Sequence, residues 1–264
     1  MSRAKLSAVC AWTLACAMFC ACSTLPTDPS ATWSTEKIYS EARDELNAGA
    51  YEKAIPLLEK LEGRAAGTPL AQQAQLEKAY AHYKAAEPVM AIVTLDRFIK
   101  LHPASPALDY ALYLKGIVNF NDDLGLLSGV TGQDLAERDQ KAAKDSFEAF
   151  KELTTRFPES RYAPDANQRM NYIIYSLAKS EVHVARYYYE RGAYLAAINR
   201  AQTAIVDYQG VPALEDALYL MAKSYDALGL EQLRDDTLRV LKKNYPETSY
   251  LKQGAASKPW WKIW

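Results

Sequence analysis

Beyond its first residues, the chain has no cysteine, and it has little histidine throughout. All four cysteines lie within the first 22 of 264 residues, at Cys10, Cys16, Cys20 and Cys22. Residues 23–264 therefore cannot form a disulfide framework, a thiolate metal cage or a cysteine nucleophile. The three histidines are far apart in the sequence, at His82, His102 and His183. This spacing argues against a histidine-rich metal site.

The chain also lacks a strong net charge and the short motifs of common enzymes. Its formal net charge is −1, so no basic field favours a nucleic-acid partner. The patterns G-x-S-x-G, H-E-x-x-H and G-x-G-x-x-G are absent, and the carboxylates are scattered along the sequence. We therefore predict a protein that is not an enzyme, with no catalytic residue, no metal and no cofactor other than a lipid.

The first 21 residues have the pattern of a secretory signal peptide. Arg3 and Lys5 form a short basic start, and the run from Leu6 to Ala21 carries no charge. This run is short for a membrane span, which needs about 20 apolar residues. No second run of that length follows, so we expect no transmembrane helix after it.

The signal ends in a segment that resembles the bacterial lipobox, in which a small residue precedes a cysteine that is acylated. Phe19-Cys20-Ala21-Cys22-Ser23 predicts cleavage before Cys22, which would carry a diacylglycerol and an N-acyl chain. Cys16 is a second candidate for acylation, and Cys20 is a poor one because Phe19 precedes it. An ordinary signal peptide with incidental cysteines is the alternative. Residues 22–35 are polar and contain proline, as a flexible tether should be.

From residue 36 to 246 the apolar spacing is helical, and no segment alternates as a strand would. The predicted fold is all-α, with short connections that make successive helices antiparallel neighbours. The ten predicted helices span residues 36–48, 51–62, 70–85, 87–101, 106–120, 139–156, 163–191, 194–208, 212–228 and 231–244. The longest segment is either one helix or two, with a break near Ser176 to Ser180.

The punctuation between these helices repeats. Gly49-Ala50-Tyr51 returns as Gly192-Ala193-Tyr194, and proline recurs at the ends of second helices. A period near 34 residues with small residues at matching positions resembles the tetratricopeptide repeat. We predict a solenoid of five repeats, interrupted between about 121 and 138. The match has departures, since no repeat carries the tryptophan of the family pattern and Arg234 stands where an alanine is expected.

Tyrosine is abundant, and five residues fall at repeat positions that line the concave groove. They are Tyr39, Arg43, Tyr80, Tyr83 and Tyr110. Aromatic groove residues suit an extended peptide that is itself rich in aromatic residues. Packing between repeats is the alternative for any one tyrosine.

Tryptophan is absent from the predicted helices and returns in residues 251–264. This segment contains Trp260, Trp261 and Trp264 with lysines beside them. Such a tail can bind a partner, pack on the last repeat or contact a membrane interface, and the sequence leaves these three open.

Several stretches resemble the BamD/ComL family of outer-membrane assembly lipoproteins. They are Leu95 to Pro103, Leu108 to Gly116, Arg138-Asp139 and Tyr187 to Arg200. The resemblance implies a non-catalytic scaffold of the β-barrel assembly machinery, lipid-anchored to the outer membrane through Cys22 and facing the periplasm. Ser23 after the acylated cysteine fits sorting to that membrane.

The resemblance also implies partners for each half of the array. Residues 36–160 would receive unfolded outer-membrane proteins through a carboxy-terminal aromatic signal. Residues 161–250 would dock a BamA-like barrel subunit beside the other assembly-machine lipoproteins, with Asn199 and Arg200 matching the family's docking pair. A pilus or secretin pilotin, a cell-wall coordination factor and a cell-wall enzyme with an unrecognised site are the alternatives.

Overall fold

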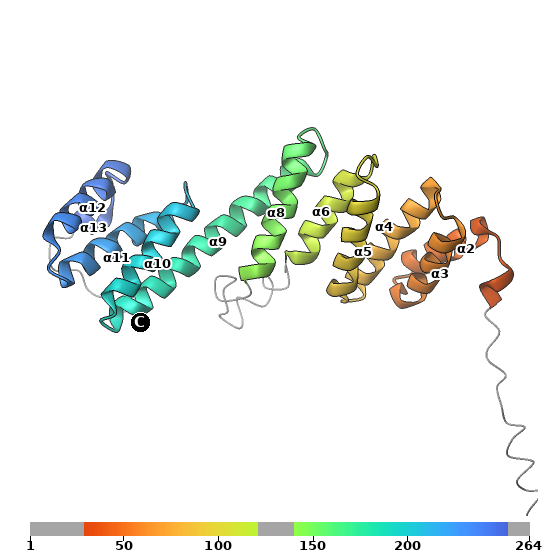
Figure 1. The fold of residues 1–264 in the computed structure, drawn as a ribbon, viewed down its shortest axis with the longest axis horizontal. Coiled ribbons are helices and arrows are strands. Elements are labelled where there is room, and N and C mark those ends of the chain that lie inside the picture. The colour runs from red at the N-terminus through yellow and green to blue at the C-terminus, as the bar shows by residue number, and fades with distance from the viewer. Residues whose placement is uncertain (1–28, 121–139, 253–264) are drawn as a thin grey trace, which may run out of the picture. The chain divides into compact units, whose positions relative to one another are not determined.

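The computed structural model describes residues 29–120 and 140–252, and helices dominate both stretches (Figure 1). All ten predicted helices are confirmed, with ends within a few residues of those expected. No strand occurs in the described stretches, so this part of the chain is all-α. The elements are η1 (Pro29–Thr32), α2 (Thr35–Asn47), α3 (Tyr51–Arg64), α4 (Pro69–Lys84), α5 (Pro88–Leu101), α6 (Leu108–Asn119), α8 (Gln140–Arg156), α9 (Ala163–Glu190), α10 (Tyr194–Asp207), α11 (Ala213–Ala227), α12 (Glu231–Asn244) and α13 (Ser249–Lys252).

The turn between the two helices of a repeat has the same backbone geometry in four places. Its residue with positive φ is Gly49, Ala86, Gly192 or Gly229, with φ between 60° and 75°. In each turn the next residue donates a 2.9 Å hydrogen bond to the carbonyl five residues before it, as Ala50 does to Glu45. This bond satisfies a carbonyl that the helix end leaves without a partner. The recurrence confirms helix pairs of the tetratricopeptide type.

The chain divides into two compact units, and the boundary falls inside α4, after Ala74. In the first unit, the described core is formed by α2 and α3, through Ile38, Ala42, Ala54, Leu58 and Leu61. The second unit contains the rest of α4 and all later elements. It has three connected apolar clusters, formed by α4 to α6, by α6, α8 and α9, and by α9 to α11.

Helix α9 contributes to two of these clusters and is continuous over 28 residues. The break considered near Ser176 to Ser180 does not occur, and both serines are buried within the helix. Ile173 and Leu177 pack with α6 and α8, whereas Val182 and Ala185 pack with α10 and α11. The length of α9 therefore follows from its packing in two successive clusters.

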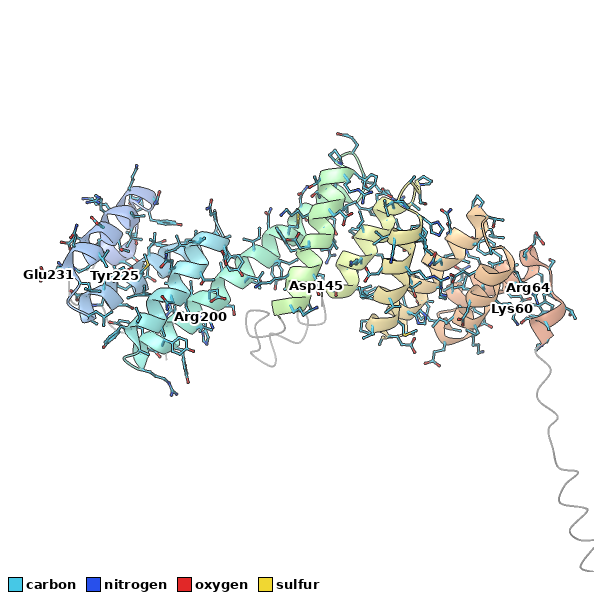
Figure 2. The ribbon with its side chains drawn as sticks, viewed as in Figure 1. Lys60, Arg64, Asp145, Arg200, Tyr225 and Glu231 are labelled. Carbon is cyan, nitrogen blue, oxygen red and sulfur yellow. The ribbon has the colours of Figure 1, made fainter. Side chains whose placement is uncertain are left out.

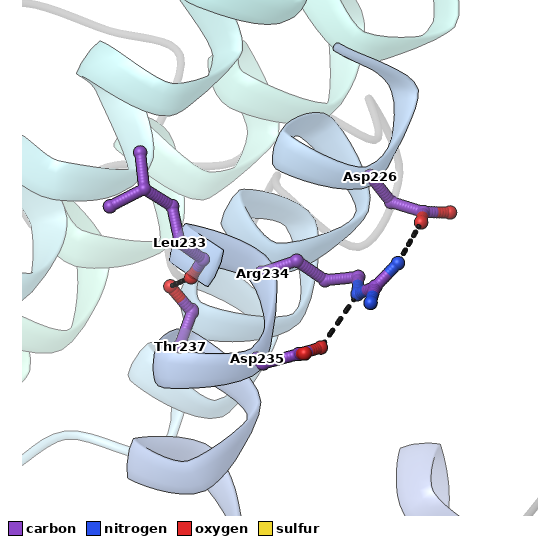
Figure 3. Close-up of polar contacts among 5 residues, drawn as sticks. All are labelled: Asp226, Leu233, Arg234, Asp235 and Thr237. Carbon is purple, nitrogen blue, oxygen red and sulfur yellow. Dashed lines mark hydrogen bonds and ion pairs between the residues drawn. The ribbon is translucent and has the colours of Figure 1, made fainter. Parts of the chain in front are cut away.

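Two residues, Gly116 and Arg234, show how the local packing accommodates a very small and a very large residue. Gly116 on α6 is buried against the ring of Phe150 on α8, which a Cβ atom at residue 116 would overlap. Arg234, at the position of an expected alanine, binds Asp226 and Asp235 at 2.9 and 2.8 Å (Figure 3). A large residue fits there because its guanidinium leaves the helix interface for these two carboxylates.

Among the helices described, none is both long enough and apolar enough to cross a membrane.

Candidate functional sites

The first two predicted groove residues lie on one face of α2 in the first unit. Ser34 caps this helix by accepting a hydrogen bond from the amide of Lys37, and the buried Ile38 and Ala42 fix its inner face. Tyr39 is half-buried, and the guanidinium carbon of Arg43 lies 6.0 Å from the centre of its ring. The pair, four residues apart, therefore presents an aromatic ring beside a cation.

The segment before α2 is held by α3, although the prediction assigns it to the tether. Arg64 donates hydrogen bonds to the carbonyls of Ala31 and Trp33 at 2.6 and 2.5 Å. Lys60 binds the hydroxyl of the buried Ser30 (Figure 2). Residues 29–34 are thus fixed to the first unit by side chains of one helix. Cys22, the predicted lipid site, lies outside the described residues.

The other three predicted groove residues, Tyr80, Tyr83 and Tyr110, lie together in the second unit. Tyr83 and Tyr110 both pack on the apolar cluster of α4, α5 and α6. Burial raises the pKa of Tyr110 to about 12, helped by the nearby Tyr162, Tyr80 and Glu77. Tyr80 is 36% exposed and so offers part of its ring to solvent. Tyr80, Tyr83 and Tyr110 therefore form one group in the second unit, and Tyr39 and Arg43 form another in the first unit.

The cluster around Tyr110 continues as a run of aromatic rings from α6 to α9. Consecutive ring centres are 4.6 to 6.4 Å apart, within the range of favourable aromatic pairs. The members, in order, are Tyr110, Tyr162, Tyr113, Phe150, Phe120 and Tyr172. We refer to these six residues as the aromatic run. Tyr172 at its far end is 48% exposed.

Polar groups along the aromatic run fix its rings. Tyr113 donates a 2.8 Å hydrogen bond to Asp165, and Arg169 donates one of 2.7 Å to the same oxygen. Burial raises the pKa of Asp165, but these two hydrogen bonds outweigh it, so the pKa is lowered overall. Arg169 also lies 4.7 Å from the ring centre of Phe120, and Arg161 lies 4.7 Å from that of Tyr162. The run is therefore flanked by two cations.

Most of the aromatic run was missed by sequence reasoning. Tyr162 lies in the turn before α9, and Phe120 is the C-cap of α6, so neither is part of a helical repeat pattern. Two signals were present in the sequence. The spacing of Tyr110 and Tyr113 places both rings on one face of α6, and that of Tyr172 and Tyr175 does the same on α9.

The opposite side of α6 faces a groove of about 570 Å³ between α5 and α8. Lys115 binds Asp96 there at 2.6 Å, Lys141 binds Asp145 at 2.8 Å, and Arg156 binds Glu152 at 2.5 Å. Three of the four carboxylates that line the groove are thus in ion pairs, and Glu148 is the fourth. This is the pattern of a charged surface rather than of convergent acid–base groups. No group of three or more possible metal ligands occurs within residues 29–120 and 140–252.

The predicted docking pair, Asn199 and Arg200, is exposed on α10. Arg200, which is labelled in Figure 2, donates a 3.2 Å hydrogen bond to Glu181 of α9. The side chain of Glu181 is 5% exposed, whereas that of Arg200 is 47% exposed. Tyr208 lies close to the same carboxylate. Its pKa is raised first by burial and then by the charge of Glu181. Arg200 therefore has a partner within the chain, which sequence reasoning did not foresee.

Comparisons with known proteins agree on one family. The family model described as an outer membrane lipoprotein (YfiO) matches residues 32–241. An outer membrane protein assembly factor BamD from Neisseria meningitidis serogroup B is 47% identical over 234 residues, covering 88% of each chain. BamD from Neisseria gonorrhoeae is 44% identical over the same shares. BamD from Vibrio cholerae is 32% identical, covering 88% of this chain and 95% of its own.

Proposed function

Since the chain belongs to the BamD family of outer membrane protein assembly factors, we propose that it binds unfolded outer-membrane proteins and docks a barrel subunit at the outer membrane. It works as a scaffold and makes or breaks no covalent bond. The observation that carries this proposal is the aromatic run with its two flanking arginines. The predicted division, with residues 36–160 for substrate and 161–250 for docking, is kept, except that the part of the aromatic run beyond residue 160 and its two arginines join the substrate surface.

The aromatic surface around Tyr80, Tyr83 and Tyr110 suits the end of an unfolded barrel strand. A terminal aromatic residue carries a ring and a carboxylate close together. Aromatic pairs add about 0.5–1.5 kcal/mol beyond buried area, and a guanidinium binds a carboxylate through paired N–H groups. The exposed edge of Tyr80 and the cation of Arg161 offer both kinds of contact. Tyr39 with Arg43 offers a second, similar contact in the first unit.

Docking of a BamA-like subunit uses Arg200 with Asn199 beside it. One N–H of the guanidinium holds Glu181, and a guanidinium has five N–H donors, so it can bind a partner carboxylate at the same time. The exposed half of Arg200 is the part that a partner would reach. The other assembly-machine lipoproteins belong to the same proposed complex.

Anchoring uses a diacylglycerol and an N-acyl chain on Cys22. Two or more chains give lasting membrane attachment, whereas one gives only reversible binding. The backbone from Cys22 to Pro29 can span at most about 24 Å, so the first unit lies near the membrane on its periplasmic side. Replacing Cys22 with alanine should move the chain to the soluble fraction when its partners are absent. Cys20→Ala is the matched control and should stay with the membrane.

Peptide binding is tested by fluorescence polarisation, with the full chain in detergent and a labelled peptide that ends in phenylalanine. Tyr80→Ala should weaken binding by about five- to ten-fold, which corresponds to about 1 kcal/mol of lost aromatic contact. The control is Tyr187→Ala, because Tyr187 is also an exposed tyrosine beside an arginine, Arg191. Equal affinities of the two variants would contradict the proposed groove.

A further inference from the structure

One side of α12, beside the residues that it buries, carries a row of half-exposed apolar side chains. Leu233 and Val240 are seven residues apart and so lie on one face of the helix, and Leu230 lies three residues before Leu233. The three are 43–45% exposed. Figure 3 shows that Leu233 points away from the ion pairs that Arg234 makes with Asp226 and Asp235. We call Leu230, Leu233 and Val240 the α12 row.

The described elements leave this row half-exposed. Helix α12 packs extensively against α11, toward which it buries Thr237 and Leu241. In a repeat array each helix pair normally covers the apolar face of its neighbour, and a final pair needs a cap. Among the described elements, α12 is the last helix of full repeat length, and only the four residues of α13 follow it.

Helix α13 begins at a fixed place beside α11. The ring of Tyr250 stacks on that of Tyr219, with centres 4.1 Å apart and planes 8° apart. Its hydroxyl donates a hydrogen bond to Asp216, which also binds Arg186 at 3.3 Å. Asp216 and Tyr219 lie in the first half of α11. Because α11 and α12 form an antiparallel pair, that half lies beside the last turns of α12, which contain Val240.

We propose that residues 253–264 fold back onto the α12 row and cap the last repeat with Trp260, Trp261 and Trp264. The eight residues from Lys252 to Trp260 can span up to about 27 Å. The distance along the helix from Asn244 back to Leu230, the far end of the row, is about 21 Å, so a segment that starts near the last turns of α12 can reach the whole row. Tryptophan has a large apolar surface, so these rings would cover the exposed parts of the leucine and valine side chains.

Charge favours the same occupant. The segment carries Lys258 and Lys262. The first turns of α12 carry exposed carboxylates at Glu231, Asp235 and Asp236. Asp235 points to the other side of the helix with Arg234 (Figure 3). Asp236 lies three residues after Leu233, beside the row, and remains 46% exposed although it binds Arg239, so it can also face a lysine of the segment.

The test measures how far iodide reaches the tryptophans of this segment. The full chain is purified in detergent with Trp12 and Trp33 replaced by phenylalanine, so that the emission comes from residues 260–264. Leu233→Asp combined with Val240→Asp should raise the quenching constant at least two-fold and shift the emission to longer wavelength. Leu195→Asp combined with Val206→Asp is the matched control, since these exposed residues lie on α10. The control should leave both quantities unchanged.

Three outcomes would overturn the proposal. Quenching that is equal in both double variants means that the tryptophans lie elsewhere, for example in the micelle. Quenching that changes on ten-fold dilution means that they pack on a second copy. A high quenching constant in the parent chain means that they are exposed.

A second measurement avoids mutating α12, whose variants could fail to fold. Replacing Trp260, Trp261 and Trp264 with alanine should uncover the row. Amide hydrogen exchange in residues 231–244 should then become at least five-fold faster, with residues 194–207 of α10 unchanged. Unchanged exchange in α12 would contradict the proposed cap.

Discussion

Replacing Arg200 with alanine should destabilise the fold itself, because it removes the partner of a buried carboxylate. Glu181 is 5% exposed, and Arg200 supplies a 3.2 Å hydrogen bond to it. A buried acceptor that loses its partner costs about 1–3 kcal/mol, and breaking a fully buried ion pair costs about 3–5 kcal/mol. Arg200 is 47% exposed, so water weakens the pair and the lower range applies. We expect a loss of about 2 kcal/mol.

The matched variant is Arg200→Ala combined with Glu181→Gln, which removes the charge that needs the arginine. Its loss should stay below about 1 kcal/mol, so the two changes are not additive. Urea unfolding of the full chain, followed by helical circular dichroism with the slope checked for constancy, measures both. A loss under about 0.5 kcal/mol for Arg200→Ala, or equal losses for the single and double variants, would refute the reasoning.

The same pair of variants separates folding from docking. Arg200→Glu would place a second carboxylate beside buried Glu181, so lost docking in that variant could reflect a damaged fold. The double variant with Glu181→Gln keeps the fold and still removes the exposed guanidinium. Co-purification of the barrel subunit with this double variant, at the level seen with the parent chain, would therefore contradict the proposed docking role.

Two further predictions follow from buried groups of the second unit. Burial raises the pKa of Tyr110 to about 12, so the contribution of this hydroxyl to stability is complete below pH 10 and is lost as the pH rises toward 12. Between pH 10 and 11 the parent chain should lose roughly 1 kcal/mol more stability than Tyr110→Phe, as measured by the midpoints of urea unfolding. Equal losses in the two chains would contradict the assignment of this pKa shift to Tyr110. Gly116→Ala should destabilise the fold by about 1–3 kcal/mol, because the added methyl group overlaps the ring of Phe150. Gly63→Ala, in open space on α3, should be neutral or stabilising by up to about 1 kcal/mol. Thermal melts measure both, and similar shifts in the two variants would contradict the packing argument.

Most of the helices could be predicted because their signals are local. Apolar spacing sets the helical face, and Gly49, Gly192 and Gly229 mark turns whose positive φ the structure reproduces. Ala86 lies 37 residues after Gly49, the distance that also separates Gly229 from Gly192, so the spacing marks this turn although alanine is unusual at φ 60°. The position of this turn is therefore predicted by the spacing of the repeats and not by the type of residue.

The short elements could not be predicted, because distant side chains hold them. The four residues of η1 depend on Lys60 and Arg64, about 30 residues away. Helix α13 is held by the stacking of Tyr250 on Tyr219. Such segments have too few residues for a periodic pattern, so their structure is decided by tertiary contacts.

The candidate sites divide in the same way. Repeat positions identified Tyr80, Tyr83 and Tyr110, which the structure groups. They could not identify Tyr162, whose ring lies between Tyr110 and Tyr113 only because the turn before α9 brings it there. Whether the five groove residues and the docking pair bind the proposed partners stays a prediction.

The bond between Arg200 and Glu181 bears on how docking would work. A free arginine side chain loses about 2 kcal/mol of rotamer entropy when it is fixed. Part of this entropy is already lost when the protein folds, because one N–H of Arg200 is held by the carboxylate of Glu181, which is buried in α9. A partner carboxylate would therefore meet a guanidinium whose position is largely set. A lysine at this position would keep the charge but lose the fork that binds two carboxylates at once, so Arg200→Lys should preserve stability better than it preserves docking.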